Sequence, residues 1–313
     1  MNKEVEDVFA RSGLPSFDYV QARTADQVVS LLTEHKEAAR LLMGGTDLFP
    51  GLREGIYRPR VVVDVKHLPG MGDILYDEGL GLTVGAAVTM NELAAHPDVQ
   101  THYPLLAQAA SAVASYQIRN RATVGGNLCN ASPCADTSPA TLVLEAEFML
   151  YGPDGQRTVP AREFFLGPGF TVLQTAELLL TIRFPRLPAS GWRAAARYLK
   201  LGRCKSGDLA LVGVAVLGFA AGTDSGCEFR IGLGSVAPTA LRASEAERIL
   251  ASNLPSREAF ALAAEKAMDA ASPITDVRGG ADYQKAMVRT LTFRALVDVW
   301  EQLQKHGLGQ SAH

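Results

Sequence analysis

Two stretches decide how this chain folds: Met43-Gly44-Gly45-Thr46-Asp47-Leu48 and Thr123-Val124-Gly125-Gly126-Asn127. Each follows a predicted helix or an apolar strand, and each places two glycines beside hydroxyl, amide or carboxylate groups. Because glycine has no Cβ, the backbone N–H groups of such a loop can approach a bulky anion. We therefore expect both stretches to be loops that contact the same ligand.

The residues around the two loops narrow the class of ligand. The first loop also fits a plain turn, and it lacks the glycine spacing of nicotinamide folds and of phosphate loops. The second is flanked by Arg119 and Arg121, although a tight turn with a solvated basic flank is the alternative. Asp136 follows in a polar stretch, where it could instead be the N-cap of a helix near 138–144. Together they predict a cofactor with a diphosphate and a polar chain, which flavin adenine dinucleotide (FAD) fits.

The bulk composition is that of a soluble globular enzyme. The chain has 313 residues, 47% hydrophobic and 20% charged, with a formal net charge of -3. It has no long basic run, so we expect no nucleic-acid partner. No apolar run approaches the roughly 20 residues that span a bilayer, and the first residues lack the apolar core of a signal peptide. With only 4 cysteines, the expected location is cytoplasmic.

The order of the predicted elements indicates an α+β fold in three units, 1–70, 71–190 and 191–313. The first unit reads as β-α-β-turn-β over 17–65, with a capping box at Thr24 and Gln27. Hairpins, helices and strands of the second unit are expected at 73–86, 89–92, 103–115, 142–151, 156–165 and 177–184. Strands of the third are expected at 195–201, 209–219 and 227–236, with a turn at 221–226 and a last helix at about 282–303.

Other candidate sites are weaker. Cys129 and Cys134 lie five apart, and Cys204 and Cys227 fall near predicted strands, which does not favour a metal cluster. The 6 histidines form no metal pair or catalytic triad, so we expect electron transfer through the cofactor rather than acid–base chemistry. Lys200 is open to two interpretations, a solvated edge strand or a cation beside the flavin.

Three segments, 43–48, 113–128 and 273–283, resemble the flavin subunits of the xanthine dehydrogenase/carbon monoxide dehydrogenase family of molybdenum hydroxylases, and the resemblance spans about residues 15–303. It implies two α+β FAD-binding subdomains of the PCMH-like type, followed by an α+β C-terminal domain. It also implies that Gly44 to Leu48 hold the pyrophosphate, with Met43 also in the cofactor site, and that Thr123 to Asn127 complete the cradle. Asp136 would bind the ribityl chain or the ring edge, and Leu180 and Lys200 would line the flavin.

The same resemblance implies that the chain is the medium subunit of a complex. A small subunit would carry two 2Fe-2S clusters and a large subunit molybdopterin cytosine dinucleotide, in a dimer of heterotrimers. Electrons would pass from molybdenum through the clusters to FAD and then to NAD, oxygen, a quinone or ferredoxin. The 4-hydroxybenzoyl-CoA reductase branch shares Cys129 but has an inserted cluster loop, and here 126–136 is short. The alternatives are a self-contained flavin oxidoreductase and a flavin-free scaffold.

Overall fold

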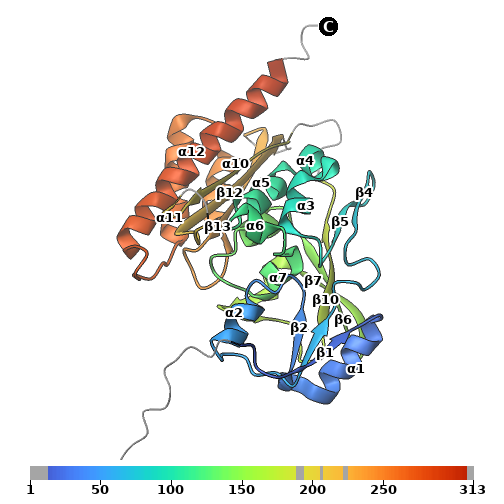
Figure 1. Cartoon of the computed structure of the whole chain (residues 1–313). Coiled ribbons are helices and arrows are strands. Elements are labelled where there is room, and N and C mark those ends of the chain that lie inside the picture. Colours follow the sequence, from blue (N-terminus) through green and yellow to red (C-terminus); the bar gives the residue numbers. More distant parts are fainter. Residues whose placement is uncertain (1–12, 188–193, 205–206, 221–224, 309–313) are drawn as a thin grey trace, which may run out of the picture.

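The computed structural model describes residues 13–187, 194–204, 207–220 and 225–308. Within these residues the strands form three larger sheets and one two-stranded ribbon. Figure 1 shows the larger sheets following one another along the molecule, from the N-terminal sheet at the bottom to the C-terminal helices at the top. Each larger sheet falls within one of the three predicted units, whose division stays a prediction.

The first sheet is small and parallel. Its elements are β1 (Asp18–Gln21), α1 (Ala25–His35), the 3-10 helix η1 (Lys36–Ala38), β2 (Ala39–Leu42), α2 (Leu48–Arg53) and β3 (Val61–Asp64), with strand order β1-β3-β2. Thr24 caps α1 as predicted, because its Oγ1 accepts the Gln27 N–H at 3.2 Å, but the predicted capping box is not closed, because Gln27 Oε1 accepts from Arg23 N instead, at 2.9 Å. The simple turn expected between β2 and β3 is wrong, because α2 lies there. Pro50 disguised this helix, but proline is tolerated in a first turn.

The second sheet is antiparallel and carries the predicted hairpins. Its order is β4 (Ile74–Asp77), β5 (Gly81–Gly85), β10 (Leu178–Phe184), β6 (Glu147–Gly152) and β7 (Gly155–Pro160). A short helix α9 (Ala161–Phe164) and the ribbon of β8 (Phe165–Gly167) and β9 (Phe170–Thr171) follow β7. The sheet therefore spans the whole of the second predicted unit, because β10 returns to pair between β5 and β6.

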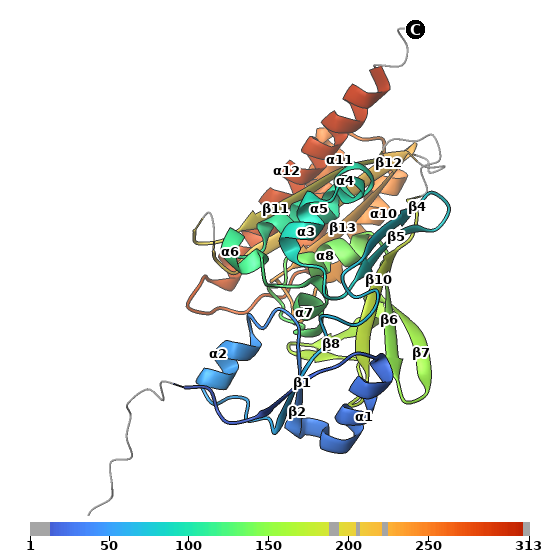
Figure 2. The same cartoon turned by 45° about the vertical axis from the view of Figure 1, so that its right-hand side comes forward.

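Helices fill the space between the second sheet and the C-terminal part. They are α3 (Met90–Ala95), α4 (Pro97–His102), α5 (Pro104–Ala112), α6 (Tyr116–Arg119), α7 (Val124–Cys129) and α8 (Thr137–Val143). The capping box of Thr89 and Glu92 is confirmed at α3. Figure 2 shows α7 between the first sheet below and the helices α3 and α8 above. The strand expected from residue 142 is wrong at its start, since 142–143 end α8; a short buried apolar run fits either structure.

The third sheet is buried on both faces. It contains β11 (Ala194–Leu201), β12 (Val212–Ala220), β13 (Cys227–Gly234) and β14 (Leu241–Arg242), and α10 (Ser244–Ser252), α11 (Arg257–Ala270) and α12 (Ala281–Leu308) follow it. Along β12 alternate side chains divide between two cores: 212, 214 and 216 pack with the C-terminal helices, and 215, 217 and 219 with the rest of the molecule. Part of the turn predicted at 221–226 lies outside the described residues.

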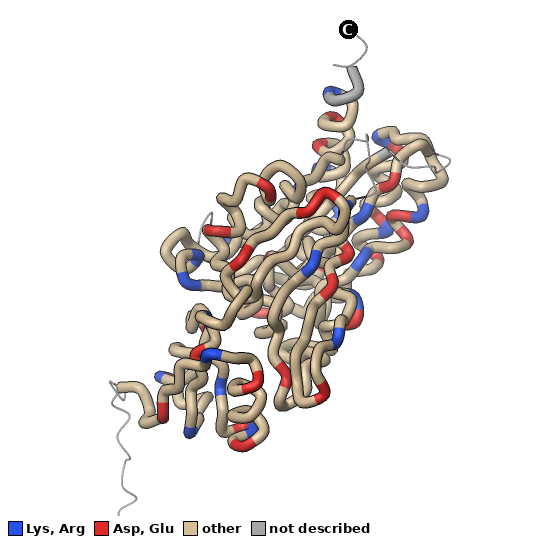
Figure 3. The backbone as a smooth tube through the Cα atoms, turned by 90° about the vertical axis from the view of Figure 1, so that its right-hand side faces the viewer, with Lys and Arg blue, Asp and Glu red and all other residues tan. Residues whose placement is uncertain are grey.

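The packing of β12 joins the C-terminal part firmly to the preceding units. One face of the sheet contacts α5 and α8, which stand beside the second glycine stretch, and the other contacts α10 to α12. Along the backbone, acidic and basic residues are interspersed rather than gathered into one stretch (Figure 3). The C-terminal sheet can therefore supply side chains to a site built on the helices before it.

Candidate functional site

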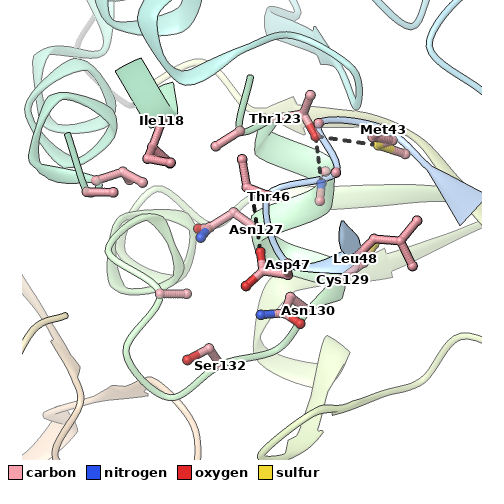
Figure 4. A pocket seen from close by; sticks show the side chains of 18 of the residues that line it. Met43, Thr46, Asp47, Leu48, Ile118, Thr123, Asn127, Cys129, Asn130 and Ser132 are labelled. Atoms are coloured by element: carbon pink, nitrogen blue, oxygen red, sulfur yellow. Dashed lines mark hydrogen bonds between the residues drawn. The ribbon is translucent and has the colours of Figure 1, made fainter. Parts of the chain in front are cut away.

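A cavity of about 560 Å³ lies where the two glycine stretches meet. The predicted residues that line it are Met43, Gly44, Gly45, Thr46, Asp47, Leu48, Thr123, Gly125, Gly126, Asn127 and Asp136. The predicted residues that do not line it are Val124, Leu180 and Lys200. Figure 4 shows Met43, Thr46 and Asp47 of the first stretch beside Thr123 and Asn127 of the second. Its volume is within the usual range for small-molecule and cofactor sites.

The first glycine stretch leaves its backbone donors free. In the described part of the chain, the N–H groups of residues 44–48 have no hydrogen-bond partner. Gly45 has φ +75°, a conformation that favours glycine, and a Cβ on Gly44 would lie 2.0 Å from the backbone oxygen of Arg121. The loop thus packs against Arg121 and Ala122, just before the second stretch, and offers a row of donors to an anion in the cavity.

The second stretch differs from the loop that the sequence predicted, because it is the capped first turn of α7. Its N–H groups already donate within the protein. The bonds are Val124 to Val88 O at 2.9 Å, Gly125 to Ala86 O at 2.9 Å, Gly126 to Thr123 Oγ1 at 3.1 Å and Asn127 to Thr123 O at 3.0 Å. Gly125 serves close packing, since a Cβ there would lie 2.5 Å from that of Ala86. This stretch therefore offers shape and side chains, not free N–H groups.

Two side chains of the second stretch tie the cavity together. The Thr123 hydroxyl contacts Met43 Sδ at 3.6 Å and so links the two stretches (Figure 4). Asn127 Oδ1 accepts a hydrogen bond from Thr137 Oγ1 at 2.6 Å, and its amide nitrogen has no partner among the described residues. Asn127 is thereby oriented, with its two N–H donors left for a ligand.

Asp136 is held from the C-terminal sheet. It occupies the N-cap position of α8 but makes no capping bond there; it accepts from Tyr198 Oη at 2.8 Å and Lys200 Nζ at 2.7 Å instead. Burial raises the pKa of Asp136, and the charge of Lys200 offsets part of that effect. Burial also raises the pKa of Tyr198 well above 10, so its hydroxyl stays a donor. Lys200 faces Asp136 and Ala112 O, at 2.9 Å, rather than the cavity.

Two further carboxylates line the cavity and were not anticipated. Glu177 pairs with Arg157 at 2.6 Å, and this hydrogen bond lowers the Glu177 pKa. Asp208 pairs with Arg203, whose side-chain hydrogen bond lowers the Asp208 pKa to about 2. The partners are only 20 and 5 positions apart, but no motif places Glu177 or Asp208 in the cavity, because the cavity is assembled from segments far apart in the chain. Leu180 lies next to Leu179, which does line the cavity, and its carbonyl accepts from Ala86 N at 2.9 Å.

The two cysteines of the cavity wall have different surroundings. Burial raises the pKa of the Cys129 thiol to about 12. Cys134 Sγ instead accepts from Arg278 Nη1 at 2.9 Å, across 144 positions of sequence. Among the described residues there is no group of three or more His, Cys, Asp or Glu that could hold a metal ion. The thiols are therefore part of the cavity wall.

An α+β fold with glycine-rich donors around a cavity of this size is typical of proteins that bind a phosphate-containing cofactor, and here a C-terminal α+β part packs against it. Comparison with known families gives a match to "FAD binding domain in molybdopterin dehydrogenase" over residues 15–187 and to "CO dehydrogenase flavoprotein C-terminal domain" over 197–299. The chain belongs to the FAD-binding medium subunits of the CO dehydrogenase/xanthine dehydrogenase family of molybdenum hydroxylases. It is an oxidoreductase flavoprotein subunit, as the sequence predicted.

Individual relatives agree along almost their whole length. The carbon monoxide dehydrogenase medium chain of Hydrogenophaga pseudoflava is 37% identical, over 91% of this chain and 98% of the relative. A putative xanthine dehydrogenase FAD-binding subunit of Escherichia coli is 31% identical over 89% and 94%.

Solved structures support the fold assignment. One of carbon monoxide dehydrogenase from Hydrogenophaga pseudoflava matches with a TM-score of 0.86 at 37% identity, covering 92% of this chain and 99% of that chain. Quinoline 2-oxidoreductase from Pseudomonas putida 86 matches at 0.85 and 28% identity, covering 93% and 99%. The predicted α+β FAD-binding fold with its C-terminal domain is confirmed. Of the described helices, none is both long and apolar enough to cross a membrane.

Proposed function

We propose that FAD binds in the cavity between the two glycine stretches, with its pyrophosphate on the backbone donors of Gly44 to Leu48. The observation that carries this assignment is the row of N–H groups at 44–48 without protein partners, in residues that line the cavity. Backbone donors left in a concave wall are the usual partners of a phosphate group. Met43 and Thr123 hold the two walls together at 3.6 Å.

The second stretch contributes side chains and shape in this proposal. The free amide N–H groups of Asn127 donate to the cofactor, while Val124 and Gly125 seat α7 against Val88 and Ala86. Asp136 keeps a lone pair on each oxygen for the ribityl chain or ring edge, since each oxygen accepts one bond from the protein. Lys200 acts through Asp136, and Leu180 supports the wall beside Leu179.

When bound, the flavin would supply electron transfer between a small partner subunit and an external acceptor. The small subunit would carry 2Fe-2S clusters, and these would receive electrons from the molybdopterin cytosine dinucleotide of a large subunit. This chain's part is to bind and orient the cofactor, because no histidine is among the described residues that line the cavity, so its thiols and hydroxyls have no imidazole base beside them. Support for partners comes from relatives described as medium chains or subunits of complexes. We further propose that the complex is a dimer of heterotrimers and that it is cytoplasmic. Within this chain, the proposed domain units remain 1–70, 71–190 and 191–313.

The test is a visible spectrum of the purified complex, with the acid-released flavin identified and quantified. We expect one FAD for each copy of this chain. Absence of flavin from the co-expressed complex would refute the assignment. The self-contained oxidoreductase is tested on the isolated, flavin-loaded chain: turnover of a substrate without partner subunits would favour that alternative over an electron-transfer subunit.

A further inference from the structure

One wall of the cavity is held mainly from the C-terminal domain. The wall segment is residues 131–136, of which Ser132, Cys134, Ala135 and Asp136 line the cavity. Its tethers are Gly169 N to Ala131 O at 3.0 Å, Ser235 N to Pro133 O at 2.8 Å, Arg278 Nη1 to Cys134 Sγ at 2.9 Å, and Tyr198 and Lys200 to Asp136. Apart from Gly169, every donor belongs to the segment matched as the C-terminal domain.

The side chain of Arg278 is held in place by several hydrogen bonds to Asp276. Asp276 accepts from Arg278 Nε at 2.9 Å and from Nη2 at 2.6 Å, and its other oxygen accepts the Arg278 N–H at 2.8 Å. The Asp276–Gly279 pair closes the loop as an isolated bridge. The guanidinium plane is thereby fixed, and Nη1 remains to donate to the Cys134 sulfur.

The loop that carries Arg278 has few other attachments. Val277, the preceding residue, is 97% exposed, and Ile274 is 73% exposed. Arg278 itself is largely covered, with 23% of its side chain exposed. The contact with Cys134 therefore depends on the Arg278 side chain rather than on the rest of its loop. Removing that side chain should change the wall at Cys134, while the tethers at Ala131, Pro133 and Asp136 remain.

We propose that Arg278 is a positioning residue for the cofactor: by holding Cys134 it fixes the wall that faces the flavin, although it does not line the cavity itself. This inference rests on the proposed function, since it takes the cavity to be the FAD site. Cys134 and Ala135 line the cavity and Arg278 does not, so loss of the contact would free this part of the wall to shift relative to the bound cofactor. The effect is on the environment of the cofactor more than on folding.

The test compares Arg278→Met, Cys134→Ala and the double variant in the purified complex. Visible circular dichroism of the bound flavin reports the ring environment, and titration of the flavin-depleted complex with FAD gives Kd. We expect both single variants to change the flavin dichroism in the same way and to weaken FAD about tenfold. The double variant should add no more than twofold, because both changes remove one contact. Val277→Ala is the matched control on the same loop and should change neither readout.

The outcomes separate this inference from the function on which it rests. Flavin absent from the unmodified complex would refute both. Flavin bound normally by that complex, with unchanged dichroism and Kd in Arg278→Met, would overturn only the role of Arg278. Should Arg278→Met fail to fold, Cys134→Ala decides, because it removes the same contact by a small truncation. Independent effects that multiply in the double variant would also overturn the proposal, since they would show that the two residues act separately.

Discussion

Gly126→Asp tests the cofactor cavity most directly, because position 126 opens into it. A Cβ at Gly126 would meet Thr123 Oγ1 at 2.8 Å and nothing else within 4 Å, and Gly126 lines the cavity. The new side chain therefore has room to extend into the cavity, and its carboxylate would lie near the proposed pyrophosphate. The variant adds a negative charge to a site that is proposed to bind an anion.

The expected penalty follows from Coulomb's law. Two unit charges about 5 Å apart at an effective dielectric constant of about 20 repel by about 3 kcal/mol. That penalty corresponds to a roughly 150-fold increase in the FAD Kd, since every 1.4 kcal/mol is tenfold. The assay is FAD titration of the flavin-depleted complex, followed by flavin quenching, at low and high salt. Salt should reduce the penalty, because it screens charges that solvent can reach.

Gly126→Asn is the matched control, since it adds the same volume and the same strain against Thr123 without the charge. We expect Asn to cost far less affinity than Asp. Equal losses in the two variants would show that the effect is steric and that no phosphate lies near residue 126. Stoichiometric FAD with an unchanged Kd in Gly126→Asp would refute the cavity assignment itself.

Three further predictions concern the frame of the cavity. Gly44→Ala places a Cβ 2.0 Å from Arg121 O, so we expect about 1–3 kcal/mol of lost stability in urea unfolding together with weaker FAD binding. Lys200→Met leaves Asp136 buried without its cation and should lower the free energy of unfolding by about 3–5 kcal/mol. Adding Asp136→Asn should restore part of this loss, and an unchanged unfolding midpoint in Lys200→Met would contradict the pairing. Asp208→Asn should destabilise the chain at neutral pH. Because the Asp208 pKa is lowered to about 2, the difference should vanish as the pH falls from about 4 toward 2, as measured by thermal unfolding.

Local patterns predicted much of the fold because they act over a few residues. The capping residues at Thr24 and Thr89 set the starts of α1 and α3, and a continuous apolar run marked β12, which the structure buries on both faces. The first glycine stretch was also predicted correctly as a loop that follows a strand. Gly45 adopts φ +75° there, a conformation that a double glycine in the sequence favours. These features depend on backbone preference and side-chain period, which a single sequence displays.

The second glycine stretch was misjudged because its glycines serve packing. Gly125 allows α7 to lie against Ala86, and that neighbour is 39 positions earlier in the chain. The hydrogen bonds that consume the N–H groups of 124 and 125 come from the same distant segment. The contact of Arg278 with Cys134, across 144 positions, has the same origin. Long-range partners are decided by tertiary packing, which no local pattern reports.

The charges of the cavity wall explain how acidic residues could surround the proposed anionic cofactor. Three of its carboxylates each have a cation: Asp136 with Lys200, Glu177 with Arg157 and Asp208 with Arg203. None of these three cations lines the cavity, so each neutralises its carboxylate from behind. The wall keeps oxygen atoms that accept hydrogen bonds from hydroxyl groups, while most of the negative charge that would repel a diphosphate is cancelled. The free N–H groups of 44–48 would then meet the proposed phosphates opposed mainly by Asp47, the one lining carboxylate of that stretch, which has no ion-pair partner among the described residues. The cavity thus combines a stretch rich in donors with wall segments rich in acceptors. A dinucleotide with a polyhydroxyl chain matches that combination better than a simple anion would.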